Sequence, residues 1–364
     1  MSARVLVAMS GGVDSGVAAA ILRETGYDVV GVAMRLAPEP PSGAPRRRAT
    51  CCSHEDFEDA RRVAERMDFP FYIVDLREDF AARVIGNFVG EYLAGRTPNP
   101  CVMCNREIKF DRLWSRARAI GADYIATGHY ARIEADGAGR PRLMRARDAA
   151  KDQSYFLFAL GRRELSRTLF PLGAMTKNDV RARARALGLR NADKPDSQEI
   201  CFVADNDYAR LVGAAADPLA LRPGRIVDAG GRELGRHPGV HHFTVGQRRG
   251  LGVAAGEALY VREIRAARGE VVVGRRAELA ARGLVAEQVN LLDPELAENP
   301  DAEIAVKIRY RHPGIPATLR VLGAARAEVR FRADGPAVTP GQACVFYRGD
   351  EVLGGGFIER ALAE

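Results

Sequence analysis

Four short runs rich in β-branched residues lie within the first 130 residues, and longer amphipathic segments separate them. The runs are "RVLVAM" at 4–9, "DVVGVAM" at 28–34, "FYIVDL" at 71–76 and "DYIATGH" at 123–129. The intervening segments, such as "DSGVAAAILRETG" and "EDFEDARRVAERM", have helical periodicity. Strands that alternate with helices form a parallel sheet with crossover helices, so the sequence predicts an α/β, Rossmann-like N-terminal domain.

The pattern changes after about residue 205. Segments such as "ALYVREIRAARGEVVVG" at 258–274 and "AEVRFRADG" at 327–335 alternate polar and apolar residues and are broken by glycine and aspartate turns. A chain of 364 residues is long enough for two or three domains. We therefore predict an α/β domain over 1–205, a small mixed or mostly β central domain over 206–276, and an antiparallel β-barrel or sandwich over 277–364.

The charge balance favours a polyanionic partner. The formal net charge is +7 and the pI is about 9.2, and basic surfaces gain affinity for phosphates by releasing counterions. Arginine greatly outnumbers lysine, a skew that base composition of a genome also produces, so charge alone leaves nucleic-acid binding open. The apolar run before Gly11 is too short for a signal peptide, so we expect a cytoplasmic protein with reduced thiols and no membrane partner. We also expect the protein to be a monomer.

A glycine-rich loop, "AMSGGVDSG" at 8–16, directly follows the first predicted strand and precedes a predicted helix. Free backbone N–H groups and the helix dipole at such a loop favour an anion, so the loop is a candidate phosphate site. It lacks the lysine of a Walker loop and the spacing of the dinucleotide-binding fingerprint. A double glycine by itself is equally typical of a tight turn.

Two cysteines three positions apart, Cys101 and Cys104, lie in "TPNPCVMCNREIKF" at 97–110. A zinc site needs four ligands, and no second C-x-x-C or H-x-x-x-H follows at a useful spacing. The tryptophan–glycine context of a redox dithiol is also absent. Arg106 and Lys109 follow Cys104 near an expected helix start, a setting that favours a thiolate. Cys201, in "DSQEICFVADNDY", is compatible either with a buried cysteine or with the edge of an active site.

The string Ser10-Gly11-Gly12-Val13-Asp14-Ser15 is similar to the SGGxDS loop of the PP-loop ATP pyrophosphatases. These enzymes cleave ATP between its α- and β-phosphates and adenylate a carbonyl oxygen. The resemblance implies ATP and Mg²⁺ as cofactors, with the loop holding the departing pyrophosphate and its magnesium. Amidating members of the class need only ammonia as nucleophile, and they need no cysteine pair.

Further motifs extend the resemblance over nearly the whole chain. In order they are "MSGGVDS" at 9–15, "CCSHEDFEDARRVA" at 51–64, "TPNPCVMCNREIKF" at 97–110, "GADYIATGHYAR" at 121–132, "KDQSYFLFAL" at 151–160, "MTKNDVRARARALGL" at 175–189, "DSQEICF" at 196–202, "GQRRGLGV" at 246–253 and "KIRYRH" at 307–312. With these motifs the chain resembles the bacterial-type tRNA-specific 2-thiouridylase family.

The resemblance implies that the enzyme adenylates the 2-oxygen of the wobble uridine in tRNAs for lysine, glutamate and glutamine, and then replaces it with sulfur. Cys201 matches the cysteine that carries sulfur as a persulfide, and Cys104 matches its partner. The partner either frees that sulfur as a hydrosulfide-like nucleophile or resolves the intermediate, which leaves a Cys104–Cys201 disulfide to be reduced. A cysteine desulfurase or a sulfur-relay protein would supply the sulfur. The residues expected to contact ATP are Ala8, Met9, Ser10, Gly11, Gly12, Val13, Asp14, Ser15, Met34 and Gly128. The residues expected to contact tRNA are Asn99, Pro100, Cys101, Lys151, Asp152, Gln153, Arg309 and Tyr310.

Cys101 occupies a position at which some members of the family have aspartate and others have cysteine. An acid–base or orienting role of that carboxylate is therefore in doubt here. Cys101, Cys104 and Cys201 could instead hold an iron–sulfur cluster with one open iron, since three thiolates suffice if the fourth position is free. The persulfide route, with no resident metal, is favoured over the cluster.

Two other functions stay open at this point. A PP-loop amidotransferase acting on a small metabolite would tolerate loss of Cys201, and a tRNA-binding or sulfur-carrier protein without turnover would tolerate loss of Asp14. Among the remaining cysteines, Cys51 and Cys52 are expected to pack at a loop, and Cys344 to lie in a buried β segment.

Overall fold

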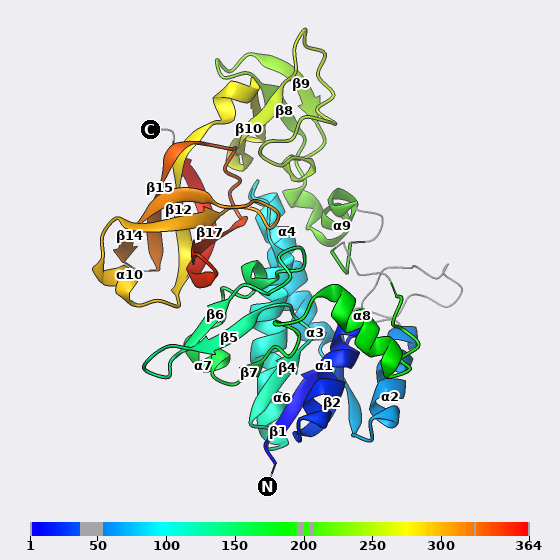
Figure 1. The fold of residues 1–364 in the computed structure, drawn as a ribbon. Helices are drawn as coiled ribbons and strands as arrows, with labels where there is room; N and C mark the ends of the chain where they lie inside the picture. The colour runs from blue at the N-terminus through cyan, green and yellow to red at the C-terminus, as the bar shows by residue number, and fades with distance from the viewer. Residues whose placement is uncertain (1, 37–53, 195–199, 204–206, 324, 363–364) are drawn as a thin grey trace. The chain divides into compact units, whose positions relative to one another are not determined.

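The alternation of strands and helices predicts a parallel sheet, and a computed structural model of the chain confirms it (Figure 1). The structure describes residues 2–36, 54–194, 200–203, 207–323 and 325–362. Strands β1 (Arg4–Ala8), β2 (Asp28–Arg35), β3 (Phe71–Asp75), β4 (Tyr124–Thr127) and β7 (Thr168–Leu169) form one sheet in the order β3-β2-β1-β4-β7. All four pairings are parallel. Cys51, Cys52 and the stretch 196–199 of one motif lie outside the described residues.

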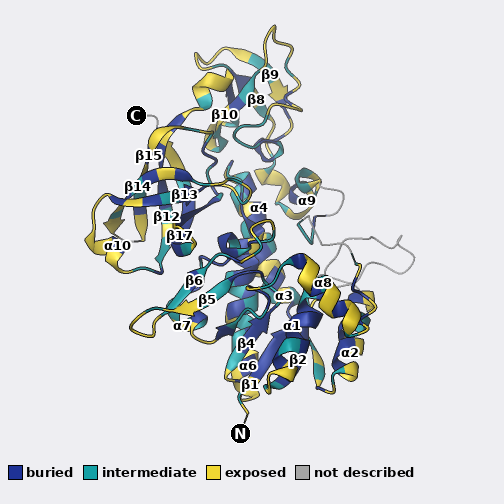
Figure 2. Cartoon of the chain, viewed as in Figure 1, coloured by how far each residue is buried: buried dark blue, intermediate teal, exposed yellow. Residues whose placement is uncertain are grey.

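Three helices share one hydrophobic core with this sheet: α1 (Val13–Glu24), α2 (His54–Arg66) and α8 (Lys177–Ala186). The core includes Val7 from β1, Val17 from α1 and Val180 from α8, all at most 4% exposed, and it is the dark interior in Figure 2. Thr176 caps α8, and its side chain and that of Asp179 satisfy each other's backbone amides. The Thr-x-x-Asp pattern predicts this capping box.

The same part of the chain holds further helices and a hairpin. They are α3 (Arg77–Phe80), a π-helix at Ala81–Ile85, α4 (Gly86–Leu93), α5 (Pro100–Met103), a π-helix at Cys104–Arg112, α6 (Leu113–Ala119), β5 (Arg132–Ala135), β6 (Pro141–Met144), a 3₁₀ turn at Ser154–Phe156 and α7 (Arg162–Leu165). By its contacts the chain divides into one unit of residues 1–84, 101–206 and 350–352 and a second of 85–100, 207–349 and 353–364. The predicted boundaries at 205 and 276 stay predictions.

A small mixed sheet lies in the second unit, in the order β10-β11-β8-β9. Its strands are β8 (Gly224–Val227), β9 (Glu233–His237), β10 (Tyr260–Arg265) and β11 (Glu270–Gly274), and helix α9 (Tyr208–Ala215) precedes them. The β11–β8 pairing is parallel and the other two are antiparallel. Ile226, Val261 and Val271 form the centre of its core, each fully buried.

The C-terminal strands close into the predicted antiparallel barrel. They are β12 (Ala281–Leu291), β13 (Ala302–Lys307), β14 (Ile315–Gly323), β15 (Arg326–Gly335), β16 (Ala343–Arg348) and β17 (Glu351–Leu362), with helix α10 (Glu295–Glu298). They follow one another in the order β12-β15-β14-β13-β16-β17, and β12 also pairs with β17. Cys344 lies fully buried in this core, and burial raises the pKa of its thiol to about 12. Its expected place in a buried strand is confirmed.

No helix in the described ranges is long and apolar enough to span a bilayer.

Candidate active site

The glycine-rich loop connects β1 to α1 and is held closed by its own side chains. Gly11 has a φ of +71°, and a Cβ atom there would lie 2.3 Å from the carbonyl oxygen of Asp56. Glycine is the residue that meets both constraints. The Ser15 hydroxyl accepts a hydrogen bond from the Ser10 amide at 3.1 Å and donates to the Gly12 carbonyl at 3.1 Å. The loop is thereby fixed against the first turn of α1.

Asp14, in that first turn, is held by two side chains from distant segments. Lys177 Nζ lies 2.8 Å from each carboxylate oxygen, and the Tyr130 hydroxyl donates to Oδ1 at 2.8 Å. Lys177 opens α8 and Tyr130 follows β4. The SGGxDS motif identifies Asp14 as a candidate, but no sequence pattern assigns a role to Lys177 or Tyr130. Both residues lie inside motifs, "MTKNDV" and "TGHY", and their place in these motifs is the one sequence signal that could have identified them. Lys177 is 163 positions from Asp14, so local spacing gives no indication of the contact.

The other residues expected to contact ATP lie at the carboxyl ends of parallel strands. Met34 is half-buried near the end of β2, and Gly128 directly follows β4. A Cβ atom on Gly128 would lie 2.7 Å from the Ser15 amide nitrogen, so this segment touches the backbone of the glycine-rich loop. Neighbouring parallel strands end at the same edge of a sheet, which is where ligands bind in open α/β folds. Contacts of these residues with ATP stay a prediction.

The oxygen donors at the loop fit magnesium. The Asp14 carboxylate is adjacent in sequence to the Ser15 hydroxyl, which lies 3.5 Å from the Ser10 hydroxyl, and hard oxygen ligands are those that Mg²⁺ prefers. Lys177 already balances the charge of the carboxylate. Within the described ranges, no group of three or more His, Cys, Asp or Glu side chains is arranged to hold a metal ion.

Cys104 lies at the junction of α5 and the following π-helix and is buried, whereas Cys101, on the preceding turn, is exposed. The side chain of the next residue, Asn105, donates from Nδ2 to the Phe156 carbonyl at 3.0 Å. Lys109 Nζ donates to Asn105 Oδ1 at 3.0 Å. The helix of Cys104 is therefore fixed to the segment that contains the "KDQSYF" motif.

The two cations near Cys104 differ in what they contact. Arg106 donates to Glu107 at 2.9 Å, and Arg83 donates to the same carboxylate at 2.8 Å. Burial raises the pKa of Glu107, but the hydrogen bonds from Arg83 and Arg106 outweigh it and the pKa is lowered overall. Glu107 therefore stays ionised and balances the charge of Arg106. Lys109 donates to the amide oxygen of Asn105 at 3.0 Å.

Cys201 is half-buried. A contact made by the next residue, Phe202, shows where this segment packs in the first unit. The rings of Phe202 and Phe80 meet edge to face with centroids 5.5 Å apart. Phe80 ends α3, which packs against the π-helix that begins with Cys104. Asp79 of α3 also forms an ion pair with Arg112, whose Nε lies 2.8 Å from Oδ1. The segments that carry the two candidate cysteines therefore pack on a common helix.

His129 lies between the glycine-rich loop and the helix of Cys104. Its Nδ1 is 2.7 Å from the Thr127 hydroxyl, and its ring centroid is 6.3 Å from that of Phe110 and 6.0 Å from that of Phe170. Burial and then the positive charge of Lys109 lower the pKa of His129 well below its usual value. The imidazole is therefore neutral at pH 7. His129 belongs to the motif "GADYIATGHYAR", but no role could be assigned to it from the motif alone.

The expected tRNA residues of the first unit do not share one environment. Asp152 is buried, and its carboxylate accepts hydrogen bonds from two backbone amides at 3.1 Å and from the Ser154 hydroxyl at 3.0 Å. Gln153 Oε1 accepts from the Tyr130 amide at 2.9 Å, and Lys151 is half-buried. Asp152 and Gln153 thus shape the turn that presents Lys151. Their contact with tRNA stays a prediction.

The expected tRNA residues of the second unit also differ in exposure. Asn99 and Pro100 are buried in the turn before α5. Arg309 is exposed and donates from Nη2 to the Ala337 carbonyl at 3.1 Å. Tyr310 is half-buried, with the Nζ atom of Lys307 at 5.9 Å from its ring centroid. These positions are compatible with a cation and an aromatic ring at a surface.

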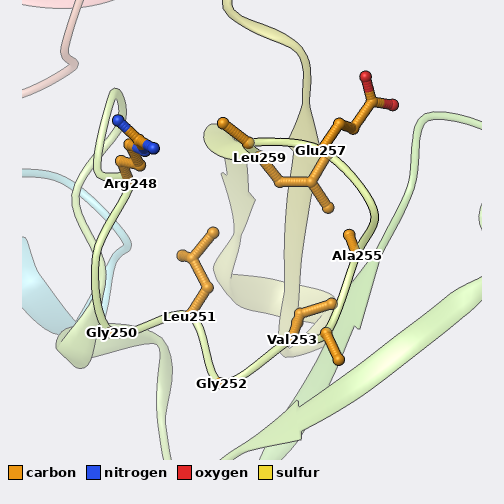
Figure 3. A pocket seen from close by; sticks show the side chains of 10 residues that line it. Arg248, Gly250, Leu251, Gly252, Val253, Ala255, Glu257 and Leu259 are labelled. Carbon is orange, nitrogen blue, oxygen red and sulfur yellow. The ribbon is translucent and has the colours of Figure 1, made fainter.

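Residues 248–259, which include part of the "GQRRGLGV" motif, form a loop that lines an open hollow of about 510 Å³ in the small mixed domain. Figure 3 shows Leu251, Val253 and Leu259 around the hollow, with Arg248 on one limb of the loop and Glu257 on the other. The hollow is therefore lined by apolar side chains together with one cationic and one anionic residue, Arg248 and Glu257.

Comparison with known proteins gives matches along the whole chain. The profile of the tRNA methyl transferase HUP domain matches residues 3–205, that of the tRNA methyl transferase PRC-barrel domain matches 216–275, and that of the aminomethyltransferase beta-barrel domain matches 281–358. A 4-thiouridine synthetase solved as an RNA complex with bound ATP is similar with a TM-score of 0.36 at 18% identity, over 56% of this chain and 46% of that one. A similarity this low does not bear on function.

Closer relatives cover nearly the whole chain. The tRNA-specific 2-thiouridylase MnmA of Geotalea uraniireducens is 54% identical over 361 residues, which are 99% of this chain and 96% of that protein. The protein of the same name from Geobacter metallireducens is 52% identical over 363 residues, 99% of this chain and 98% of that one. Given this identity, and a catalytic-domain profile that covers more than half of the chain, the protein belongs to the tRNA-specific 2-thiouridylase family.

Proposed function

We propose that this chain is an ATP-dependent sulfurtransferase that converts the wobble uridine of tRNA to 2-thiouridine. The observation that carries the proposal is the similarity to proteins of that name over 99% of the chain. The α/β unit supports it, because its glycine-rich loop, Asp14 and the β4 terminus lie together at the carboxyl edge of a parallel sheet.

The first step is adenylation of the uridine. The 2-oxygen attacks the α-phosphorus of ATP, the bond to the β-phosphate oxygen breaks, and pyrophosphate leaves. Residues 8–15 hold the phosphates, and Met34 and Gly128 contact the rest of the nucleotide. Magnesium, when bound at Asp14 and the serine hydroxyls, supplies positive charge to the phosphates. The product is a C2–O–AMP linkage, in which a poor leaving group has become a good one.

The second step is sulfur transfer. The terminal sulfur of a Cys201 persulfide attacks C2, so that a C2–S bond forms and AMP leaves with the electron pair of the C2–O bond. The Cys104 thiolate then attacks Cys201 Sγ, and the electron pair of the broken S–S bond stays on the sulfur attached to C2. The products are 2-thiouridine and a Cys104–Cys201 disulfide, which an external thiol reduces. Release of hydrosulfide by Cys104, which then attacks C2 itself, gives the same products.

A turnover assay tests this function. Purified protein with unmodified tRNA, a persulfide donor, Mg²⁺ and ATP is expected to form AMP and thiolated tRNA in equal amounts. AMP formation without tRNA would identify an amidotransferase-like activity on a small molecule. Binding of tRNA with no AMP formed would identify a carrier or binding protein, and either result would overturn the proposal.

The sulfur route has its own prediction. Because the persulfide route requires the thiols of Cys104 and Cys201 and no metal, we expect the protein purified without oxygen to be iron-free and fully active. Cys101→Ser is expected to keep at least about half of the activity. Iron and acid-labile sulfide analysis checks this. Stoichiometric iron, lost together with activity on chelation or in Cys101→Ser, would establish the cluster route.

We also propose that the tRNA-contacting surface of the second unit extends beyond Arg309 and Tyr310. A Cβ atom on Gly246 would lie 3.7 Å from Arg309 Nη2, so the turn of the "GQRRG" motif lies beside Arg309. Arg248 and Arg249 in this turn are exposed. Cationic side chains gathered in this way position phosphates without reading sequence.

Replacing Arg248 and Arg249 together with alanine is expected to weaken tRNA binding and to reduce the slope of log K against log salt by about 1.5 to 2, because each lost phosphate contact removes about one released counterion. Filter binding at several salt concentrations measures the slope. Arg232→Ala is the control, because Arg232 is exposed in the same domain but paired with Asp228 at 3.2 Å. An unchanged slope in the double variant would exclude this surface.

A further inference from the structure

The connection between α4 and α5, residues 94–99, has no regular secondary structure, yet most of it is buried. Ala94 is exposed, and the residues after it are buried or half-buried. The connection leads directly into Pro100, the first residue of α5, and the π-helix that begins with Cys104 follows. Backbone groups of a buried irregular segment need partners from other parts of the fold. The partners of residues 94–99 therefore show what holds this segment in place.

A turn of the barrel binds the backbone of the connection. The Thr97 amide donates to the Pro340 carbonyl at 2.8 Å. Gln342 Nε2 donates to the carbonyls of Thr97 and Pro98, at 3.0 Å each. A Cβ atom on Gly341 would lie 2.9 Å from both the nitrogen and the oxygen of Thr97, so the two backbones are in direct contact. The barrel therefore fixes residues 97 and 98.

The small mixed domain contacts the same connection. A Cβ atom on Gly95 would lie 2.5 Å from Ile264 Cγ2 in β10. The Thr97 hydroxyl lies 3.2 Å from the hydroxyl of Thr244. All of these residues belong to the second unit. Two separate sheets of that unit thus hold neighbouring residues of one short segment.

Arg96 adds an ionic link between α4 and the barrel. Its Nε donates to Glu91 in α4 at 2.7 Å, and its Nη2 donates to Glu287 in β12. The three side chains are between 21% and 31% exposed. A planar guanidinium directs its donors along fixed lines, which a flexible ammonium does not. Arg96 therefore sets where the connection leaves α4, one residue before the backbone contacts of Thr97.

The residues that follow the connection are those that we assign to tRNA and to sulfur transfer. Asn99, its last residue, and Pro100 are buried, and the buried Cys104 follows four positions after Pro100. Secondary elements move as rigid pieces, so a displacement at the start of α5 also moves the residues after it. The contacts that Asp14 makes in the ATP loop come from other segments. A change at Arg96 is therefore expected to leave the ATP loop in place.

We propose that Arg96 is a positioning residue for the chemistry on the bound uridine. By joining α4 to the barrel, it holds the connection so that Asn99 and Cys104 are correctly placed when the second unit binds tRNA. The inference rests on the proposed function, and it gives the second unit a part in turnover beyond binding tRNA. The same unit that contacts tRNA thereby fixes the segment that leads to the cysteine helix.

A split between binding and turnover tests this role. Arg96→Met removes the guanidinium and keeps an unbranched side chain. We expect it to slow single-turnover thiolation at saturating tRNA and ATP by about 10- to 100-fold, the scale of effect of a displacement of about 1 Å, with the Kd values of tRNA and ATP unchanged within about threefold. Arg96→Lys keeps the charge without the planar fork and is expected to fall between the two. An unchanged rate, or tRNA affinity lost in proportion to the rate, would overturn the proposal.

Two further variants test whether Arg96 acts through the barrel. Glu287→Gln removes the barrel side of the link and is also expected to slow thiolation. The double variant should be no slower than Arg96→Met alone, because the two residues act through one contact. Arg326→Met is the matched control, since Arg326 forms an ion pair with Glu359 at 2.7 Å between two strands of the same barrel. We expect this control to thiolate normally, and independent, additive losses from Arg96 and Glu287 would contradict the proposed link.

Alkylation of Cys104 by iodoacetamide gives a measurement that needs neither ATP nor tRNA. Cys104 is buried, so its alkylation requires local opening. In Arg96→Met we expect Cys104 to be alkylated at least about tenfold faster. Cys344, fully buried in the second unit, should stay as slow as in the unchanged protein and reports any unfolding of that unit. Peptide mass spectrometry measures both thiols. An unchanged rate at Cys104, or faster alkylation of both thiols, would refute the positioning role whether or not the chain thiolates tRNA.

Discussion

Replacing Cys104 or Cys201 with serine is expected to reduce tRNA thiolation by at least about a thousandfold, and the double variant should lose no more than either single one, because residues that act in one chemical sequence are not additive. Serine cannot carry a persulfide sulfur at position 201, and at position 104 it cannot form the disulfide that releases the product. Electrophoresis of tRNA in a mercury-containing gel measures the thiolated fraction.

These variants should affect the two proposed steps, adenylation and sulfur transfer, differently. The glycine-rich loop and its partners Tyr130 and Lys177 are contributed by β1, β4 and α8, and none of these contacts involves Cys201. We therefore expect Cys201→Ser to retain tRNA-dependent release of pyrophosphate in a single turnover. Loss of pyrophosphate release with intact ATP binding would show that the cysteine acts before adenylation, contrary to the proposed order.

Cys344→Ala is the matched control for these variants. Cys344 is fully buried in the barrel, and burial raises the pKa of its thiol to about 12. A thiol in that state is protonated at neutral pH and is a poor nucleophile. Thiolation by Cys344→Ala should therefore equal that of the unchanged protein, with a loss of about 1 kcal/mol in unfolding free energy from the removed sulfur.

The elements that the sequence predicts best are those with a local physical cause. The strand at 28–34 and the helix after Gly12 follow from periodicity, and the start of α8 follows from the capping box of Thr176. The closed barrel is also confirmed. Strands β14 and β15 largely alternate between buried and more exposed residues, whereas β16 and most of β17 are buried. The π-helical turn at 104–112 has no comparable signal, since its backbone pattern depends on packing rather than on residue type.

The candidate site shows where sequence reasoning reaches its limit. Asp14 could be chosen from its motif, but its partners depend on how three segments pack together. The sequence "KDQ" suggests that Asp152 is a polar surface residue. Its carboxylate is instead buried and accepts hydrogen bonds from residues of its own turn. Polar residues that stabilise a loop and polar residues that contact a ligand have the same composition, so only tertiary structure separates them.

Gly128→Ala is expected to lower ATP affinity by about a hundredfold, the scale of effect that a displacement of about 1 Å has on a positioned site. The added Cβ would lie 2.7 Å from the Ser15 amide nitrogen and 2.9 Å from the Asp14 carbonyl carbon. Both are backbone atoms, so neither can rotate away as a side chain would. The end of β4 or the first turn of α1 must shift, and the backbone donors expected to hold the phosphates shift with it.

ATP titration and thermal unfolding of Gly128→Ala separate this local effect from general destabilisation. Gly137→Ala is the matched control, since Gly137 lies in the β5–β6 turn of the same unit and an added Cβ there meets nothing within 4 Å. We expect the control to bind ATP normally. If Gly128→Ala binds ATP as tightly as the control, the contact between β4 and the loop does not position the nucleotide. If Gly128→Ala weakens the binding of ATP and AMP alike while the protein stays folded, the backbone shift affects the whole nucleotide pocket, as contact with the first turn of α1 predicts.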